Sequence, residues 1–267
     1  MLDHLLDQDR WGSLYLRSLL HEFGVSPTAH AEHGRFLGGQ RGEGLTAALF
    51  SGNSRNLSSL GDVADLAPLL ERAFQGHPSP RLFVGPAEHA RSVREAFARH
   101  GALPFLDREQ LYYVLTPEAL APGDSVSIRP ARDDEVECVT LAQAAMTEED
   151  LCVSRSHIDL GRLREISARR IAAGKVWVVM EGSALLFKAE ESARTGDGLL
   201  IGGVFTEPAH RGRGLATRGI AAWARLLFEN GLAVIALHVN RDNLPAIRAY
   251  ERVGFRRHSV LRLMLTY

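Results

Sequence analysis

The chain has 267 residues, of which 45% are hydrophobic and 24% are charged, and its formal net charge is −1. This length can bury the core of one large domain or two small ones, and the charge balance gives no reason to expect a nucleic-acid or membrane partner. Two cysteines without C-x-x-C spacing argue against a disulfide framework and a zinc site, and no metal-ligating constellation is found. The acidic start lacks the features of a secretory signal, and no apolar run approaches the ~18–20 residues of a membrane span, so we expect a cytoplasmic protein.

One segment has the composition of a linker. The stretch TPEALAPGDS, residues 116–125, places prolines and a glycine between two regions of periodic hydrophobicity. We therefore expect two domains, at residues 1–121 and 122–267.

The first half mixes helical and strand patterns and shows few signs of chemistry. In chain order we expect a helix at 2–23 broken at Gly12, strands at 35–39 and 45–51, a helix at 64–75, a strand at 81–85, a helix at 88–100 and a closing strand at 109–115.

The second half has clearer patterns. We expect a strand at 126–130, helices at 134–146 and 160–173, strands at 175–181, 183–190 and 199–206, a helix from Leu215 to Gly231, a strand at 232–239, a helix at 243–254 and a last strand at 255–267. The order strand, helix, strand around Leu215 implies a right-handed crossover between parallel neighbours.

The segment EPAHRGRGLATRG, residues 207–219, joins a buried strand to a helix. The first N–H groups of a helix lack partners inside it, and the helix dipole favours negative charge there. Gly212 and Gly214 leave the backbone open and permit positive φ, while Arg211 and Arg213 supply charge-assisted donors. The segment therefore predicts a binding site for an anion with several phosphate oxygens.

Two other phosphate-binding designs fit this segment less well. A nucleotide P-loop requires G-K-[ST], which does not follow. A dinucleotide fingerprint has Thr217 at its third small position, and no acidic residue ends the next strand.

The same residues resemble a known family. The stretch VFTEPAHRGRGLA resembles the acetyl-CoA loop of the GNAT (GCN5-related N-acetyltransferase) superfamily, whose signature R/Q-x-x-G-x-G/A matches Arg211, Gly214 and Ala216. Downstream, NRDNLPAIRAYERVGF resembles the second conserved segment of that family, and IRPARDDE resembles its first strand. The resemblance covers about residues 126–267.

The resemblance implies a mixed α/β fold with a mixed sheet, in which the C-terminal half is a GNAT domain. The order of elements in the N-terminal half is similar to a smaller, degenerate copy of that fold. SGNSRNLSSLGD lacks the arginine–glycine loop, so this lobe is expected to be non-catalytic.

The resemblance also implies a position for acetyl-CoA. The pyrophosphate would lie on the loop amides, and the pantetheine arm would pair with the preceding strand, where Gly202–Gly203 and Pro208 suit a bulged strand with free edge groups. A backbone N–H of strand 199–206 would then donate to the oxyanion. The implied cofactor-binding residues are Val204, Phe205, Thr206, Arg211, Gly212, Arg213, Gly214, Leu215, Ala216, Thr217, Asn240 and Asn243.

Tyr250 is the candidate general acid, because a phenol can protonate the departing thiolate. Asn243 is a good helix N-cap, and Tyr250 returns to nearly the same helix face seven residues later. Glu207, at the end of the strand before the loop, is the candidate base, and an ordered water could deprotonate the amine instead. The other carboxylates considered, at Glu181, Glu190 and Asp197, are expected to be solvated on the surface.

These features predict an acetyl-CoA-dependent N-acetyltransferase that acts by direct attack of an unidentified amine, on a small molecule or a protein. The alternative is a CoA-binding regulatory or scaffold protein without catalysis. The last strand could pair across a twofold axis, which leaves a homodimer open.

Overall fold

The computed structural model describes residues 1–25, 29–30, 33–76, 78–124, 126–151 and 153–267, so Ser125 of the expected linker and Cys152 lie outside the described residues. Contacts divide the chain into two compact units. Unit 1 comprises Met1–Tyr113, His238–Asp242 and Arg257–Tyr267, and unit 2 comprises Val114–Leu237 and Asn243–Arg256. This division falls between residues 113 and 114, whereas the sequence suggested 121 and 122, and the end of the chain returns to unit 1.

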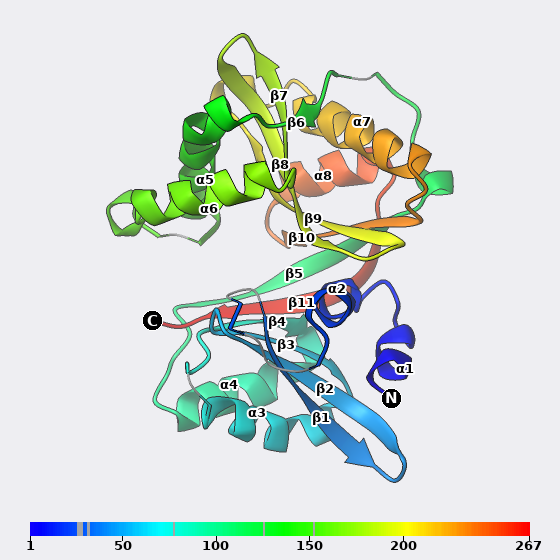
Figure 1. Ribbon diagram of the computed structural model, residues 1–267, viewed down its shortest axis with the longest axis vertical. Coiled ribbons are helices and arrows are strands. Elements are labelled where there is room, and N and C mark those ends of the chain that lie inside the picture. The colour runs from blue at the N-terminus through cyan, green and yellow to red at the C-terminus, as the bar shows by residue number, and fades with distance from the viewer. Residues whose placement is uncertain (26–28, 31–32, 77, 125, 152) are drawn as a thin grey trace. The chain divides into compact units, whose positions relative to one another are not determined.

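Unit 1 is a mixed sheet with helices on both faces (Figure 1). Its strands, in spatial order, are β1 (Gly34–Arg41), β2 (Gly44–Gly52), β3 (Asn56–Gly61), β4 (Leu82–Pro86), β11 (Arg256–Leu265) and β5 (Leu106–Leu115). Its helices are α1 (Leu2–Asp7), α2 (Leu14–Phe23), α3 (Leu66–Phe74) and α4 (Ala90–Arg99), with 3₁₀ turns η1 (Val63–Asp65) and η2 (Ala87–His89).

Alternation along β2 explains how both faces of this sheet are covered. Leu49 lies in the core beneath α3 and α4, whereas the next residue, Phe50, packs against α1 and α2. Successive side chains of a strand point to opposite faces, so one strand serves both helix layers. The predicted break of the first helix near Gly12 and the predicted hairpin of β1 and β2 are confirmed.

Strand β3 was not predicted from the sequence, and the serines of this strand explain why. Leu57 and Ser59 point inward at alternate positions, but only the leucine carries an apolar signal. The buried Ser59 hydroxyl hydrogen-bonds with His89 Nδ1 (2.8 Å), and His89 Nε2 lies 3.0 Å from the carbonyl oxygen of Gly61. The polar pair is thereby satisfied inside the core.

The last strand, β11, has neighbours of the same chain on both edges. It pairs with β4 in antiparallel register, for example Leu263 with Val84, and β5 follows on its other side. The expectation that this strand could pair across a twofold axis is therefore wrong, because both edges are already occupied.

Unit 2 holds the first part of strand β10 (Val234–Asn240), up to Leu237, followed in spatial order by β9 (Gly198–Thr206), β8 (Ala184–Arg194), β7 (Val176–Glu181) and β6 (Arg129–Pro130). Its helices are α5 (Val136–Leu151), α6 (Leu160–Ala172), α7 (Leu215–Glu229) and α8 (Leu244–Val253), with 3₁₀ turns η3 (Pro117–Ala119), η4 (Asp133–Glu135), η5 (Arg155–His157) and η6 (Pro208–His210). The predicted α and β elements of this half are confirmed, with β6 shorter than expected.

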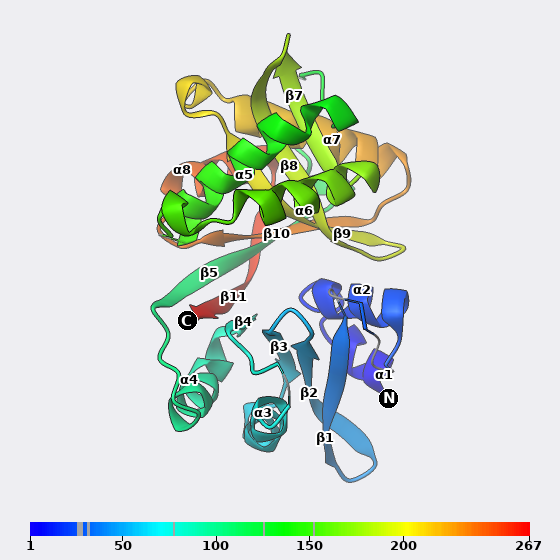
Figure 2. The same ribbon diagram turned by 60° about the vertical axis from the view of Figure 1, so that its left-hand side comes forward.

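The helices of unit 2 form two layers. Figures 1 and 2 both show α5 and α6 on one side of β7–β9, and α7 and α8 on the other. Val176 and Val178 of β7 face α5 and α6, while Trp177 between them lies 5.4 Å from Trp223 of α7, measured between ring centroids. α7 approaches the sheet closely at Gly219, because a Cβ there would lie 2.8 Å from the ring of Phe187.

The expected linker is folded onto unit 2. Pro117–Ala119 form η3, and the N–H of Ala121 donates to the carbonyl oxygen of Val253 (2.9 Å). Gly254 ends α8 with φ of 111°, and a Cβ there would lie 1.9 Å from the carbonyl oxygen of Ala119. Only glycine fits this close approach, which holds the segment against the end of α8.

Candidate active site

The loop between β9 and α7 is open to solvent. Gly212 and Gly214 have φ of 75° and 70°, and a Cβ at either position would meet no atom within 4 Å. Both residues adopt the left-handed region that glycine favours, and Gly214 is the N-cap of α7. The glycines therefore shape the turn and leave its outer side empty.

The loop presents a row of backbone donors. Within the described chain, no acceptor takes a hydrogen bond from the amides of residues 212–217. The N–H of Arg218 is the first to close a helical turn, onto the carbonyl oxygen of Gly214 (3.0 Å). Six consecutive N–H groups at the positive end of a helix dipole can hold an anion with several oxygen atoms.

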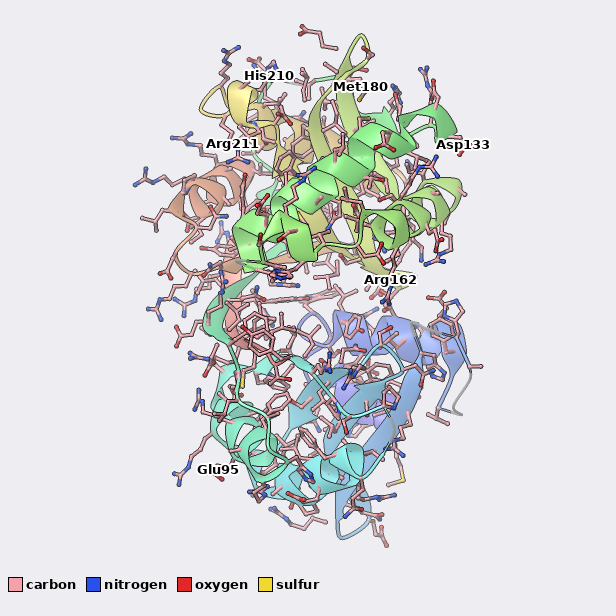
Figure 3. The ribbon with its side chains drawn as sticks, turned by 90° about the vertical axis from the view of Figure 1, so that its left-hand side faces the viewer. Glu95, Asp133, Arg162, Met180, His210 and Arg211 are labelled. Carbon is pink, nitrogen blue, oxygen red and sulfur yellow. The ribbon has the colours of Figure 1, made fainter. Side chains whose placement is uncertain are left out.

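Arg211 contacts three groups around this loop. Its Nε donates to the carbonyl oxygen of Thr206 (2.9 Å), and one terminal nitrogen donates to both carboxylate oxygens of Glu149 (2.9 and 3.0 Å). The guanidinium also lies over the ring of Phe205, 5.4 Å from its centroid. Figure 3 labels this side chain next to His210. Arg211 thus links the loop to the last turn of α5.

Arg218 is a basic residue that the sequence analysis did not select. Its Nε is buried and has no hydrogen-bond partner among the described residues. Helical side chains lean toward the N-terminus of their helix, which directs Arg218 toward the turn that begins at Gly214. The sequence could have indicated this residue, because Arg218 follows Gly214 by four residues and so lies on the same face of the helix.

The end of β9 is bulged, as the sequence predicts. Lys188 pairs with Phe205 and Glu190 with Gly202, so Gly203 and Val204 together oppose the single residue between them on β8. Gly203 has φ of 57°. The parallel pairing of β9 with β10 ends at Ile201. The strand therefore continues into the loop without a β10 partner on that edge, as expected for a strand that splays from its neighbour.

Tyr250 is buried on α8. Burial raises the pKa of its hydroxyl above the ordinary value, and the negative charge of Asp150 raises it further. Asn243 caps α8 by accepting a hydrogen bond from the N–H of Ala246 (3.2 Å), which confirms its predicted structural role. The last turn of α5 thus carries both Glu149, which pairs with Arg211, and Asp150, whose charge acts on Tyr250.

The comparisons with known proteins agree with this geometry. Residues 170–255 match a family model described as Acetyltransferase (GNAT) family. The chain is 30% identical over 221 residues to a mycothiol acetyltransferase of Gordonia bronchialis, covering 72% of this chain and 69% of that protein.

The chain belongs to the GNAT acetyltransferase family.

Two further comparisons define the extent of the likeness. A mycothiol acetyltransferase of Rhodococcus jostii is 28% identical over 204 residues, which cover 68% of this chain and 63% of that protein, so the chain spans less than two thirds of its length. A GCN5-related N-acetyltransferase from Kribbella flavida superposes with a TM-score of 0.60 at 16% identity, over 96% of this chain and 94% of that one. The latter shares the fold along both halves of the chain.

The carboxylates considered for this GNAT protein differ in environment. Glu207 is half-buried directly after β9, and its N–H donates to the carbonyl oxygen of Leu186 (3.0 Å). Asp197 accepts a hydrogen bond from the Thr195 hydroxyl (2.7 Å) in the turn between β8 and β9. Glu181 is exposed at the end of β7. The expectation of a solvated Glu190 is wrong, because this residue is buried and paired with Lys188 and Arg170.

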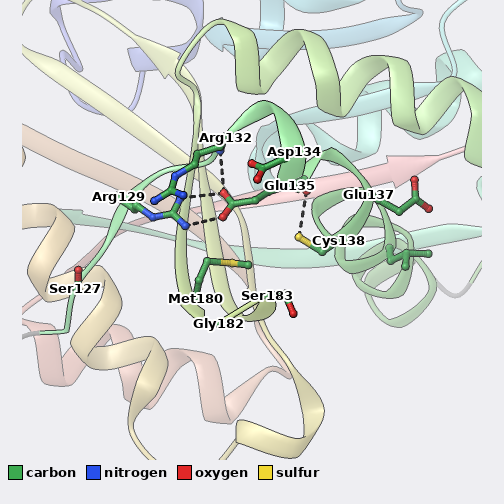
Figure 4. A pocket seen from close by; sticks show the side chains of 11 residues that line it. Ser127, Arg129, Arg132, Asp134, Glu135, Glu137, Cys138, Met180, Gly182 and Ser183 are labelled. Atoms are coloured by element: carbon green, nitrogen blue, oxygen red, sulfur yellow. Dashed lines mark hydrogen bonds and ion pairs between the residues drawn. The ribbon is translucent and has the colours of Figure 1, made fainter.

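Unit 2 also contains an open cavity of about 680 Å³ between η4, the start of α5 and the β7–β8 turn (Figure 4). Arg129 donates to both carboxylate oxygens of Glu135 in its wall, and the Cys138 thiol donates to the carbonyl oxygen of Glu135 (3.1 Å). Figure 3 shows Asp133 and Met180, beside this cavity, well away from Arg211. The cavity is thus separate from the glycine loop.

Two kinds of feature are absent from the described residues. None of their helices combines the length and apolar character of a membrane span. They hold no cluster of three or more His, Cys, Asp and Glu side chains arranged to bind a metal ion.

Proposed function

We propose that this chain transfers the acetyl group of acetyl-CoA to the amine of a small molecule. The observation that carries the proposal is the row of six open amides at residues 212–217, directly after a bulged strand that has left its β10 neighbour. The name of the curated relatives, mycothiol acetyltransferase, supports a small-molecule acceptor.

The chain offers donors for each part of the cosubstrate. The amides of 212–217 would hold the pyrophosphate, with Arg211, Arg213 and the orphaned Nε of Arg218 adding positive charge. The backbone of Val204–Thr206 would pair with the pantetheine amides. For this, Arg211 must leave the Thr206 carbonyl oxygen and its ion pair with Glu149. The roles of Asn240 and Asn243 toward the cofactor stay predictions.

Acetyl-CoA supplies an activated thioester. The neutral amine attacks the carbonyl carbon and a C–N bond forms, while the C=O π electrons move to the oxygen. A backbone N–H of the bulge stabilises this oxyanion. When the C=O bond re-forms, the C–S bond breaks and the thiolate leaves with the electron pair. The attacking nitrogen loses one proton, for which Glu207 is the proposed acceptor, directly or through water.

Tyr250 is the proposed donor of the proton that the thiolate gains. Its burial raises the pKa of the phenol, and the same exclusion of water would raise that of a thiolate formed beside it. The two pKa values therefore move in the same direction, and proton transfer between the groups stays possible.

The test is release of free CoA thiol from acetyl-CoA in the presence of a panel of amines, including mycothiol that lacks its acetyl group. Amine-dependent thiol release is expected, with loss of turnover in Tyr250→Phe. A protein that binds CoA in calorimetry but releases no thiol with any amine would instead be the CoA-binding regulator without catalysis. Failure to bind CoA would contradict both.

For the N-terminal region we propose a non-catalytic, degenerate GNAT-like lobe. Its fold supports this, because α3 and α4 cover one face of a mixed sheet as helices do in unit 2. Deleting residues 1–120 would remove β4, the partner of β11. Substitutions on the surface of unit 1 are therefore the better test, and a non-catalytic lobe predicts that they leave acetyl transfer unchanged.

A further inference from the structure

A group of charged side chains, Lys188, Glu190 and Arg170, lies next to the bulge of β9. Lys188 of β8 has no exposed surface, and its ammonium donates to three oxygen atoms: Oε1 of Glu190 (2.5 Å), Oε1 of Gln143 (2.7 Å) and the carbonyl oxygen of Gly203 (3.0 Å). The three N–H groups of the ammonium are therefore all used. One of its three partners is the backbone of the bulge itself.

The group contains two cations and one anion. Arg170 of α6 donates from Nε to Oε2 of Glu190 (2.7 Å) and from a terminal nitrogen to the carbonyl oxygen of Glu191 (2.8 Å). Burial by itself would raise the pKa of Glu190, but the charges of Lys188 and Arg170 outweigh this and hold it below its ordinary value. The carboxylate therefore stays ionised between two basic side chains.

Holding charge in this position is costly. Burial lowers the pKa of Lys188 despite the opposing charge of Glu190. Apolar side chains of similar volume often replace buried ion pairs without loss of stability. The fold alone therefore gives little reason for a lysine here, whereas its bond to Gly203 connects it to the candidate site.

The carbonyl of Gly203 and the N–H of Val204 belong to one peptide group. In a trans peptide these two bonds point in opposite directions, so an N–H whose carbonyl faces Lys188 points away from it. Hydrogen bonds also polarise one another in series. An ammonium on the carbonyl oxygen thus fixes the plane of this group and makes the N–H of Val204 a stronger donor.

On the basis of the proposed function, we propose that Lys188 is a positioning residue, which orients and polarises the Gly203–Val204 peptide group so that the Val204 N–H holds the thioester carbonyl oxygen of acetyl-CoA. Glu190 and Gln143 keep the ammonium in place. Arg170 neutralises Glu190 from the other side and does not contact Gly203. The sequence gives no sign of this, since Lys188 and Gly203 are on different strands.

The test compares two variants, each of which lacks one of the two basic side chains that pair with Glu190. Lys188→Met removes the contact with Gly203, and Arg170→Met leaves it in place. The probe is acetyl-CoA carrying ¹³C at the acetyl carbonyl, observed by isotope-edited infrared spectroscopy on the full chain. The wild-type complex should show this band at lower wavenumber than free acetyl-CoA does. The shift should largely persist in Arg170→Met and be mostly lost in Lys188→Met.

Turnover should follow the same order. Deleting an oxyanion donor costs roughly 10²–10³-fold in kcat, so weakening one should lower kcat about tenfold. Lys188→Met should show that loss with KM for acetyl-CoA changed less than threefold, and Arg170→Met should lose less. Equal infrared shifts in the two variants, or equal losses of kcat, would overturn the role of Lys188 while leaving acetyl transfer intact. No binding of acetyl-CoA to the wild-type chain would overturn the proposed function as well.

A measurement on the wild-type protein avoids any doubt about the folding of Lys188→Met. The amide proton of Val204 should move downfield in NMR spectra when acetyl-CoA is added, because its N–H would then donate to the polarised thioester carbonyl oxygen. An unchanged Val204 resonance in a complex whose loop amides at 212–217 do shift would refute the proposal.

Discussion

Under the proposed function, Glu149 would compete with acetyl-CoA for Arg211. Its carboxylate accepts two hydrogen bonds from the guanidinium, while Arg211 Nε occupies the carbonyl oxygen of Thr206. A phosphate group and the pantetheine arm need these same partners under the proposed function. Replacing Glu149 with glutamine should therefore lower the cost of freeing Arg211 and tighten the binding of acetyl-CoA.

The size of the effect follows from exposure. The side chains of Arg211 and Glu149 are 44% and 47% exposed, so solvent screens the pair strongly. Exposed ion pairs contribute about 0.2–1 kcal/mol. Since about 1.4 kcal/mol corresponds to a tenfold change in Kd, the Kd of acetyl-CoA should fall by up to about fivefold.

Isothermal titration calorimetry at low and high salt measures this change. Glu148→Gln is the matched control, because it removes the same charge one residue away. Among the described residues, the Glu148 carboxylate accepts a hydrogen bond from the N–H of Arg155 (3.3 Å) and none from Arg211. Glu149→Gln should bind more tightly than Glu148→Gln at low salt, and the difference should shrink near 1 M salt, where the Debye length is about 3 Å. Equal Kd values for the two variants at low salt would refute the competition.

Four more results are expected. Tyr250→Phe should lower kcat at neutral pH by about 10²-fold with little change in KM for acetyl-CoA, as loss of a general acid does, and full turnover would exclude the role. Because burial raises the pKa of Tyr250, the acid stays protonated in alkaline solution, so kcat of the wild-type enzyme should show no loss assignable to this group below about pH 10. Gly203→Ala should destabilise unit 2 by more than the ~1–2 kcal/mol of a left-handed alanine, because its Cβ would lie 2.8 Å from Cδ of Glu190. Gly182→Ala is the control, because Gly182 has φ of 59° and open space around it. In denaturant titration this control should lose only the conformational cost in unfolding free energy. Equal losses of stability in the two variants would contradict this. Arg218→Met should weaken CoA binding without lowering stability, since its Nε has no partner within the described chain to lose, and unchanged Kd would remove it from the site.

The sequence predicted the elements whose signals are local. The glycine loop, the bulge at Gly203 and the cap at Asn243 each follow from the conformational preference of a few neighbouring residues. The parallel crossover through α7 follows from the handedness of such connections and is confirmed by the pairing of β9 with β10.

Features that depend on distant residues were not predictable in this way. Ser59 is compatible with a buried strand only because it forms a hydrogen bond with His89, thirty positions away. The sequence of β11 does not show that this strand lies between β4 and β5, so its edges could be taken as free. Glu190 was expected on the surface because its ion pairs with Arg170 and Lys188 are formed only in the folded chain.

The ligand on the loop amides is the central question for this GNAT protein. A crystal structure of the wild-type chain with acetyl-CoA tests it most directly. We expect pyrophosphate oxygens within hydrogen-bond distance of the N–H groups of residues 212–217, with Arg211 turned away from Glu149. Acetyl-CoA bound elsewhere, with those amides facing only solvent and the Arg211–Glu149 pair unbroken, would contradict it.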